Sequence, residues 1–122
     1  MKVPFFDLSR QYEKIGSKIE NAAIKVLRSG DYILGQEVKE LEDEKKDYCK
    51  SKYSIGVASG SDALVIALKA LNVQEGDEVI IPSFSFFATA GAVARVGAKP
   101  VFADISSRDF NLDIKDFKNK IT

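Results

Sequence analysis

The chain has 122 residues, 45% hydrophobic and 30% charged, and this length and composition suit one globular domain at most. Its 18 basic residues balance 18 acidic ones, which excludes a long-range field for nucleic acid or anionic membranes, and no apolar run approaches the roughly 20 residues that span a bilayer. A single cysteine excludes an internal disulfide and, together with the lack of a secretory signal, favours the cytoplasm. The absence of histidine excludes catalysis or a metal site that depends on histidine.

Residues 1–52 carry the pattern of two amphipathic helices. In the first, apolar residues recur at steps of three and four from Leu8 to Leu27, and Gly30 suits the left-handed backbone that ends a helix. In the second, an apolar stripe includes Cys49, which we expect to be a small buried side chain rather than a nucleophile. We therefore expect this part to be an amino-terminal helical segment.

From residue 53 onward, short apolar runs alternate with helical runs. Because the crossovers are helical and the connections short, residues 53–122 predict an α/β fold with a mostly parallel sheet flanked by helices. A sheet of three strands leaves open edges, so we expect this region to be the first part of a larger domain. The tail predicts a loop and then a capped helix near residues 111–117. The expected strands are Tyr53–Val57, Glu78–Ile81 and Pro100–Ala103, and the expected helices between them are Asp62–Leu71 and Phe87–Val96.

A glycine-serine turn, Gly60-Ser61-Asp62, opens the first of these helical runs. The start of a helix presents free backbone N–H groups and the positive end of the helix dipole, which together favour a phosphate. Phe86 follows the next expected strand, where its ring can cover a flat ligand. A phosphate cradle and an aromatic cover suggest a phosphorylated aromatic cofactor, of which pyridoxal phosphate is the first candidate.

Each of these residues also has a purely structural interpretation. The Gly60-Ser61 turn can serve packing alone, and Asp62 can be an acid that the helix dipole favours in the first turn. Phe86 can be a core residue. A nucleotide-binding site is a poorer alternative, because neither G-x-G-x-x-G nor G-x-x-x-x-G-K-[S/T] occurs.

Six short segments carry a wider resemblance. They are Val3–Leu8, Gly30–Gly35, Ser59–Leu64, Gly76–Pro82, Phe84–Ala90 and Gly97–Asp104, the last followed by Phe110–Asp113. In this order and with these gaps they resemble the start of the DegT-like nucleotide-sugar aminotransferases, which are pyridoxal-phosphate enzymes of the aspartate aminotransferase fold, fold type I. The resemblance covers essentially the whole chain.

The resemblance implies a role for several residues. Ser61 and Asp62 would hold the cofactor phosphate through their backbone amides, Gly60 would belong to the same cofactor-binding turn, and Phe86 would stack on the pyridine ring. A second set resembles segments near the sugar site and the dimer interface, which implies a homodimer. This second set is Phe6, Asp7, Tyr32 and Gly35.

The resemblance also implies an activity for the parent protein. It would transfer an amino group, with glutamate as donor, to a keto group of a nucleotide-linked deoxysugar, in making surface polysaccharide such as lipopolysaccharide, or antibiotics. The family's Schiff-base lysine and the carboxylate under the pyridinium nitrogen fall beyond Thr122, so we expect no catalytic residue here and no activity from the chain alone. Two alternatives stay open: a sugar dehydratase of the same family that uses pyridoxamine phosphate (PMP), and a non-catalytic remnant or interaction fragment.

Overall fold

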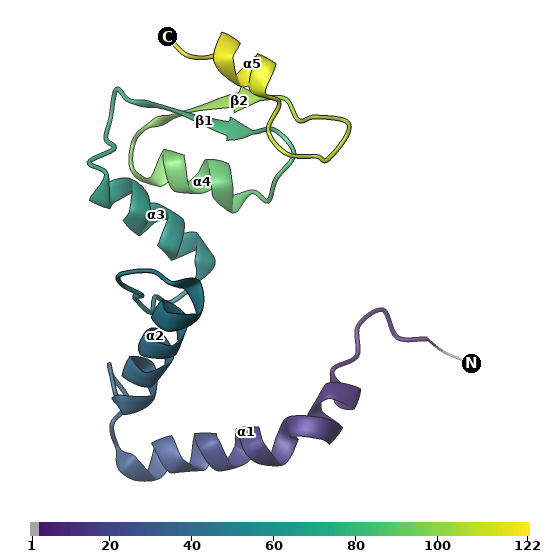
Figure 1. The fold of residues 1–122 in the computed structure, drawn as a ribbon, viewed down its shortest axis with the longest axis vertical. Coiled ribbons are helices and arrows are strands. Elements are labelled where there is room, and N and C mark those ends of the chain that lie inside the picture. Colours follow the sequence, from purple (N-terminus) through teal and green to yellow (C-terminus); the bar gives the residue numbers. More distant parts are fainter. Residues whose placement is uncertain (1–2) are drawn as a thin grey trace. The chain divides into compact units, whose positions relative to one another are not determined.

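The computed structural model describes residues 3–122, and the chain forms two compact units that divide between Gly56 and Val57. The first unit is helical, and the second contains the sheet (Figure 1). No helix in the described part of the chain is long and apolar enough to cross a membrane.

The first unit consists of α1 (Ser9–Ser29) and α2 (Gln36–Cys49). Gly30 has a φ of 74° and ends α1 in the left-handed conformation, which confirms the predicted stop. The prediction of a buried Cys49 is wrong, because this side chain is exposed. None of the residues of α2 is buried, so its apolar stripe finds no cover within this unit.

The second unit begins with α3 (Gly60–Ala70) and continues with β1 (Glu78–Pro82), α4 (Ala88–Arg95) and β2 (Lys99–Ala103). The two strands are parallel, with Glu78 opposite Lys99, and α4 makes the crossover between them. Figure 1 shows α4 packed between the sheet and α3. The predicted parallel α/β arrangement is therefore confirmed.

The last helix, α5 (Ile114–Asn119), follows a loop as predicted. The Asp113 carboxylate caps it by accepting a hydrogen bond from the Lys115 N–H at 2.7 Å. Asp116 ties α5 to the end of β2, because its Oδ2 accepts from the Asp104 N–H at 2.7 Å.

The predicted strand Tyr53–Val57 is wrong, because the sheet of the described residues has two strands, β1 and β2. The segment is instead an irregular, exposed connection, in which the Gly56 N–H donates to the Glu42 carboxylate at 2.7 Å. An apolar run becomes a strand only where a neighbouring strand pairs with its N–H and C=O groups. Nothing in the described residues supplies that partner.

The core of the second unit lies between α4 and the sheet. Ile81 of β1, Val93 of α4 and Ala98 are buried together, and Val93 is only 2% exposed. Leu68 of α3 packs against the edge of this cluster. These contacts fix α4 on the sheet and α3 on α4.

We expect Val93→Ala to lower the free energy of unfolding by about 2 kcal/mol, because it removes buried methyl groups and leaves a small cavity. Val57→Ala is the matched control, since Val57 lies in the same unit but is 40% exposed. Urea unfolding followed by far-ultraviolet circular dichroism measures both variants. Equal losses would show that Val93 is not central to the core.

Candidate functional site

The start of α3 is organised by Ser59. Ser59 has an extended backbone, and its Oγ accepts a hydrogen bond from the Asp62 N–H at 3.1 Å. The same hydroxyl donates to Asp62 Oδ2 at 2.9 Å. Among the described residues, the N–H groups of Gly60 and Ser61 have no acceptor. The free donors at this helix end are therefore the amides of Gly60 and Ser61, while the Asp62 amide, also expected to face a phosphate, is already used by the cap.

Sequence reasoning missed one charged residue at this place, Arg95. Its Nη1 lies 3.3 Å from Asp62 Oδ1, at the far end of α4. The two residues are 33 positions apart, so no local sequence pattern indicates that they are in contact. The hydrogen bond from Ser59, followed by that from Arg95, holds the pKa of Asp62 below its ordinary value. Asp62 therefore remains a carboxylate at neutral pH.

A cavity of about 280 Å³ brings together two of the four predicted cofactor residues, Ser61 and Phe86, while Gly60 and Asp62 do not line it. Ser61 lines it from α3, Phe86 from the loop after β1, and Arg95 from the end of α4. Phe86 is 78% exposed, so it is not a core residue. The remaining lining residues are Phe87, Ala88, Gly91 and Ala92.

The loop that carries Phe86 is held at both ends. The Ser83 N–H donates to the Ala103 carbonyl at 2.8 Å, which extends the pairing of β1 and β2 by one bond. The hydroxyls of Ser85 and Thr89 lie 2.9 Å apart and join the loop to the first turn of α4. Phe86 thus sits just beyond the carboxyl end of a parallel strand, where α/β folds bind ligands.

These residues fit a phosphorylated aromatic cofactor. Two free amides at a helix start and the Ser61 hydroxyl are donors suited to an anion, and the Arg95 guanidinium adds a positive charge to the same cavity. The exposed ring of Phe86 borders the same cavity and can stack on a flat ring. In residues 3–122, by contrast, no group of three or more His, Cys, Asp or Glu side chains is placed to hold a metal ion.

The second predicted set lies in the helical unit, at the two ends of α1. Phe6 and Asp7 precede α1, and Asp7 Oδ1 accepts from the Ser9 N–H at 2.8 Å. Tyr32 and Gly35 follow α1. Since α1 has 21 residues, about 30 Å of helix separates the two pairs, so they do not form one site within this unit.

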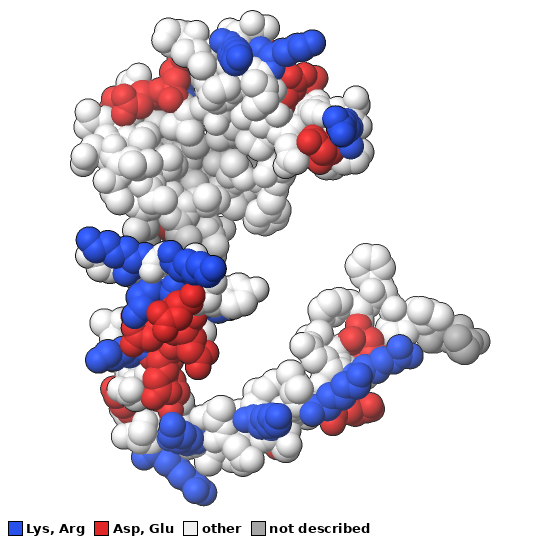
Figure 2. Space-filling model, in the orientation of Figure 1, with Lys and Arg blue, Asp and Glu red and all other residues white. Residues whose placement is uncertain are grey.

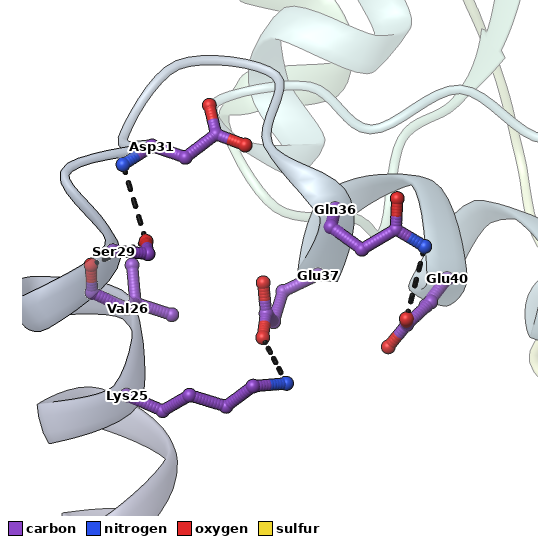
Figure 3. Close-up of polar contacts among 7 residues, drawn as sticks. All are labelled: Lys25, Val26, Ser29, Asp31, Gln36, Glu37 and Glu40. Carbon is purple, nitrogen blue, oxygen red and sulfur yellow. Dashed lines mark hydrogen bonds and ion pairs between the residues drawn. The ribbon is translucent and has the colours of Figure 1, made fainter.

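The connection between α1 and α2 is a tight, polar turn (Figure 3). Lys25 and Glu37 form an ion pair across it at 2.7 Å, and the Asp31 N–H donates to Ser29 Oγ at 3.1 Å. The Tyr32 hydroxyl donates to the Leu27 carbonyl at 2.9 Å. A Cβ added at Gly35 would come within 2.6 Å of the Asp31 carbonyl oxygen, so the turn needs glycine there.

The charged side chains are mixed over the surface. In the view of Figure 2, acidic side chains gather in a band along α2 with basic side chains around it, and most of the visible face of the second unit is uncharged. Both signs of charge are present on this face, in agreement with the balanced composition.

Comparison with known proteins gives a family match over residues 13–122, to the DegT/DnrJ/EryC1/StrS aminotransferase family. The chain is 49% identical to the UDP-2-acetamido-2-deoxy-3-oxo-D-glucuronate aminotransferase of Pseudomonas aeruginosa, covering 98% of the chain and 33% of that protein. It is 48% identical to the pleiotropic regulatory protein of Geobacillus stearothermophilus, covering 100% of the chain and 33% of that protein. The chain thus spans about a third of the length of the curated relatives it matches.

A solved structure supports the same fold. The crystal structure of NtdA from Bacillus subtilis, with its bound cofactor PMP, superposes with a TM-score of 0.93 at 35% identity. The match covers 99% of this chain and 28% of that one. A neighbour with this fold therefore carries a cofactor of the kind expected from the sequence.

The hydrogen bonds at the start of α3 predict an unusual titration of Asp62. Because the pKa of Asp62 is lowered in the folded chain, its contribution to stability is present above the unfolded value, about 3.9, and is lost as the pH falls through the folded pKa. We expect Ser59→Ala to raise this pKa toward its ordinary value, because it removes the larger cause of the shift. Carboxylate ¹³C NMR during a pH titration measures the change.

Ser61→Ala is the matched control for this titration, because no hydrogen bond joins the Ser61 hydroxyl to Asp62 in the described residues. An equal rise of the pKa in both variants would contradict the assignment of the shift to the Ser59 cap.

Proposed function

Since the chain belongs to the DegT/DnrJ/EryC1/StrS aminotransferase family, we propose that it is the cofactor-phosphate-binding part of a pyridoxal-phosphate-dependent sugar aminotransferase. The parent enzyme transfers an amino group, with glutamate as the donor, to the keto group of a nucleotide-linked sugar. The name of the Pseudomonas aeruginosa relative, an aminotransferase of a UDP-linked 3-oxo sugar, supports this substrate class.

The observation that carries the proposal is the shared cavity of Ser61 and Phe86. Ser61 brings a helix start with two free amides, and Phe86 brings an exposed aromatic ring. In the proposed enzyme the amides of Gly60 and Ser61 hold the phosphate, and Phe86 covers one face of the pyridine ring and keeps water from it. Bound pyridoxal phosphate supplies an electron sink that no side chain offers.

The proposal places Phe6, Asp7, Tyr32 and Gly35 near the sugar. About 30 Å of helix separates the two pairs, so one sugar cannot touch both pairs of the same chain. A homodimer resolves this, because each site can then take one pair from each copy. The exposed apolar stripe of α1 supports such an interface, since Tyr12, Ile19 and Leu27 are all at least half exposed.

A chimeric enzyme tests the activity. We expect residues 1–122, put in place of the matching third of the Pseudomonas aeruginosa aminotransferase, to retain glutamate-dependent amination of the UDP-linked keto sugar. Ser61→Pro in the chimera should reduce kcat/KM at subsaturating cofactor by about tenfold or more, because it removes one phosphate donor. Ser61→Ala, which keeps the N–H, should lose much less. Equal losses in the two variants would mean that the Ser61 amide does not bind the phosphate.

Light scattering tests the homodimer. We expect the 122-residue chain to give a mass above its monomer mass of 13.4 kDa, rising with concentration. Ile19→Asp should return the monomer mass, because it places a charge in the apolar stripe of α1. Lys18→Asp, the neighbouring control, should leave association intact. A monomer mass for the unchanged chain over a wide concentration range would refute the dimer proposal.

A further inference from the structure

The proposed phosphate site contains a carboxylate that works against it. Asp62 lies in the first turn of α3, one residue after Ser61. A negative charge at a helix start is stabilised by the dipole, but it repels a phosphate at the same end. Because the pKa of Asp62 is lowered, this carboxylate is charged at neutral pH. A nearby positive charge is therefore needed to offset the negative charge of Asp62.

Both oxygens of this carboxylate are held, each by a different partner. Oδ2 accepts from Ser59 Oγ at 2.9 Å, and Oδ1 faces Arg95 Nη1 at 3.3 Å. Ser59 is neutral, so Arg95 is the cation that balances the charge in this contact. Arg95 is the last residue of α4 and lines the cavity that Ser61 and Phe86 share.

We propose that Arg95 is a positioning residue for the phosphate site. Its guanidinium balances the charge of Asp62 and holds that carboxylate beside the cap, so that the amides of Gly60 and Ser61 attract a phosphate instead of facing an uncompensated negative charge. This inference rests on the proposed function, because it assigns Arg95 a role at the phosphate site proposed there.

The packing of the second unit explains why Arg95 can do this. Val93, two residues earlier on α4, is anchored in the core, which fixes the end of the helix beside the start of α3. The small residues Gly91 and Ala92 line the cavity one turn before Arg95 and leave it open. A Cβ at Gly91 would meet the Phe87 ring at 3.3 Å, so even an alanine there would crowd the cavity wall.

Titration with inorganic phosphate tests the inference without catalysis. The amide NMR signals of Gly60 and Ser61 in the 122-residue chain report binding, which we expect to be weak, with a Kd of about a millimolar or above. At low ionic strength, Arg95→Gln should raise the Kd about threefold, because it leaves the Asp62 charge uncompensated. Asp62→Asn should lower the Kd by a similar factor. The double variant should return to the Kd of the unchanged chain.

Two further measurements separate this role from a structural one. Arg95→Lys keeps the charge and should leave the Kd almost unchanged, which shows that the effect of Arg95→Gln is not misfolding. Added potassium chloride should shrink the difference between Arg95→Gln and the unchanged chain, because salt screens charges at this exposure. Circular dichroism checks that every variant is folded.

Three results of the phosphate titration would overturn the proposed role of Arg95. A double variant that binds as weakly as Arg95→Gln would overturn the inference, because Arg95 would then contact the phosphate itself. No change of Kd in Arg95→Gln would overturn it as well, while the phosphate site would stand. Absence of any phosphate-dependent shift at Gly60 and Ser61 in the unchanged chain would remove the phosphate site and the role of Arg95 together.

Discussion

The packing of α4 against the parallel pair β1 and β2 is the contact on which the rest of the second unit depends. Val93 is buried between Ile81 and Ala98, and this contact fixes the crossover helix on the sheet. Three site elements follow from it: the start of α3, which packs on α4; the loop of Phe86, which leads into α4; and Arg95, which ends α4. Residues that are distant in the sequence therefore share one cavity because one helix is anchored.

The electrostatics of that cavity are a balance of local charges. The two free amides of Gly60 and Ser61 attract an anion, and the Asp62 carboxylate opposes it. The carboxylate is nevertheless useful, because it shares the cap with Ser59 and so helps to start α3. If this helix start binds an anion as proposed, the Asp62 carboxylate needs a nearby cation to balance it, and Arg95 lies 3.3 Å from that carboxylate.

Local features of the fold could be read from the sequence, and long-range ones could not. The stop at Gly30 and the capped helix that follows the loop near residue 111 depend on a few neighbouring residues, and both were predicted correctly. The strand at 53–57 was predicted wrongly, because its formation depends on a partner strand elsewhere, and Cys49 was expected to be buried although nothing in its unit covers it. Arg95 was missed because only the packing of α3 on α4 brings it to Asp62.

The helical unit constrains the distance between the two predicted site segments at the ends of α1. The segments around Asp7 and Tyr32 resemble segments near the sugar site and the dimer interface, yet a helix of 21 residues, about 30 Å long, lies between them. The turn after α1 is tight, with Gly35 close to the Asp31 carbonyl and Lys25 paired with Glu37, and the Tyr32 hydroxyl reaches back only to the Leu27 carbonyl in the last turn of the helix. If both segments border the sugar, they reach it from two copies of the chain. The length of α1 would then make the proposed homodimer a requirement of substrate binding and not only a gain in stability.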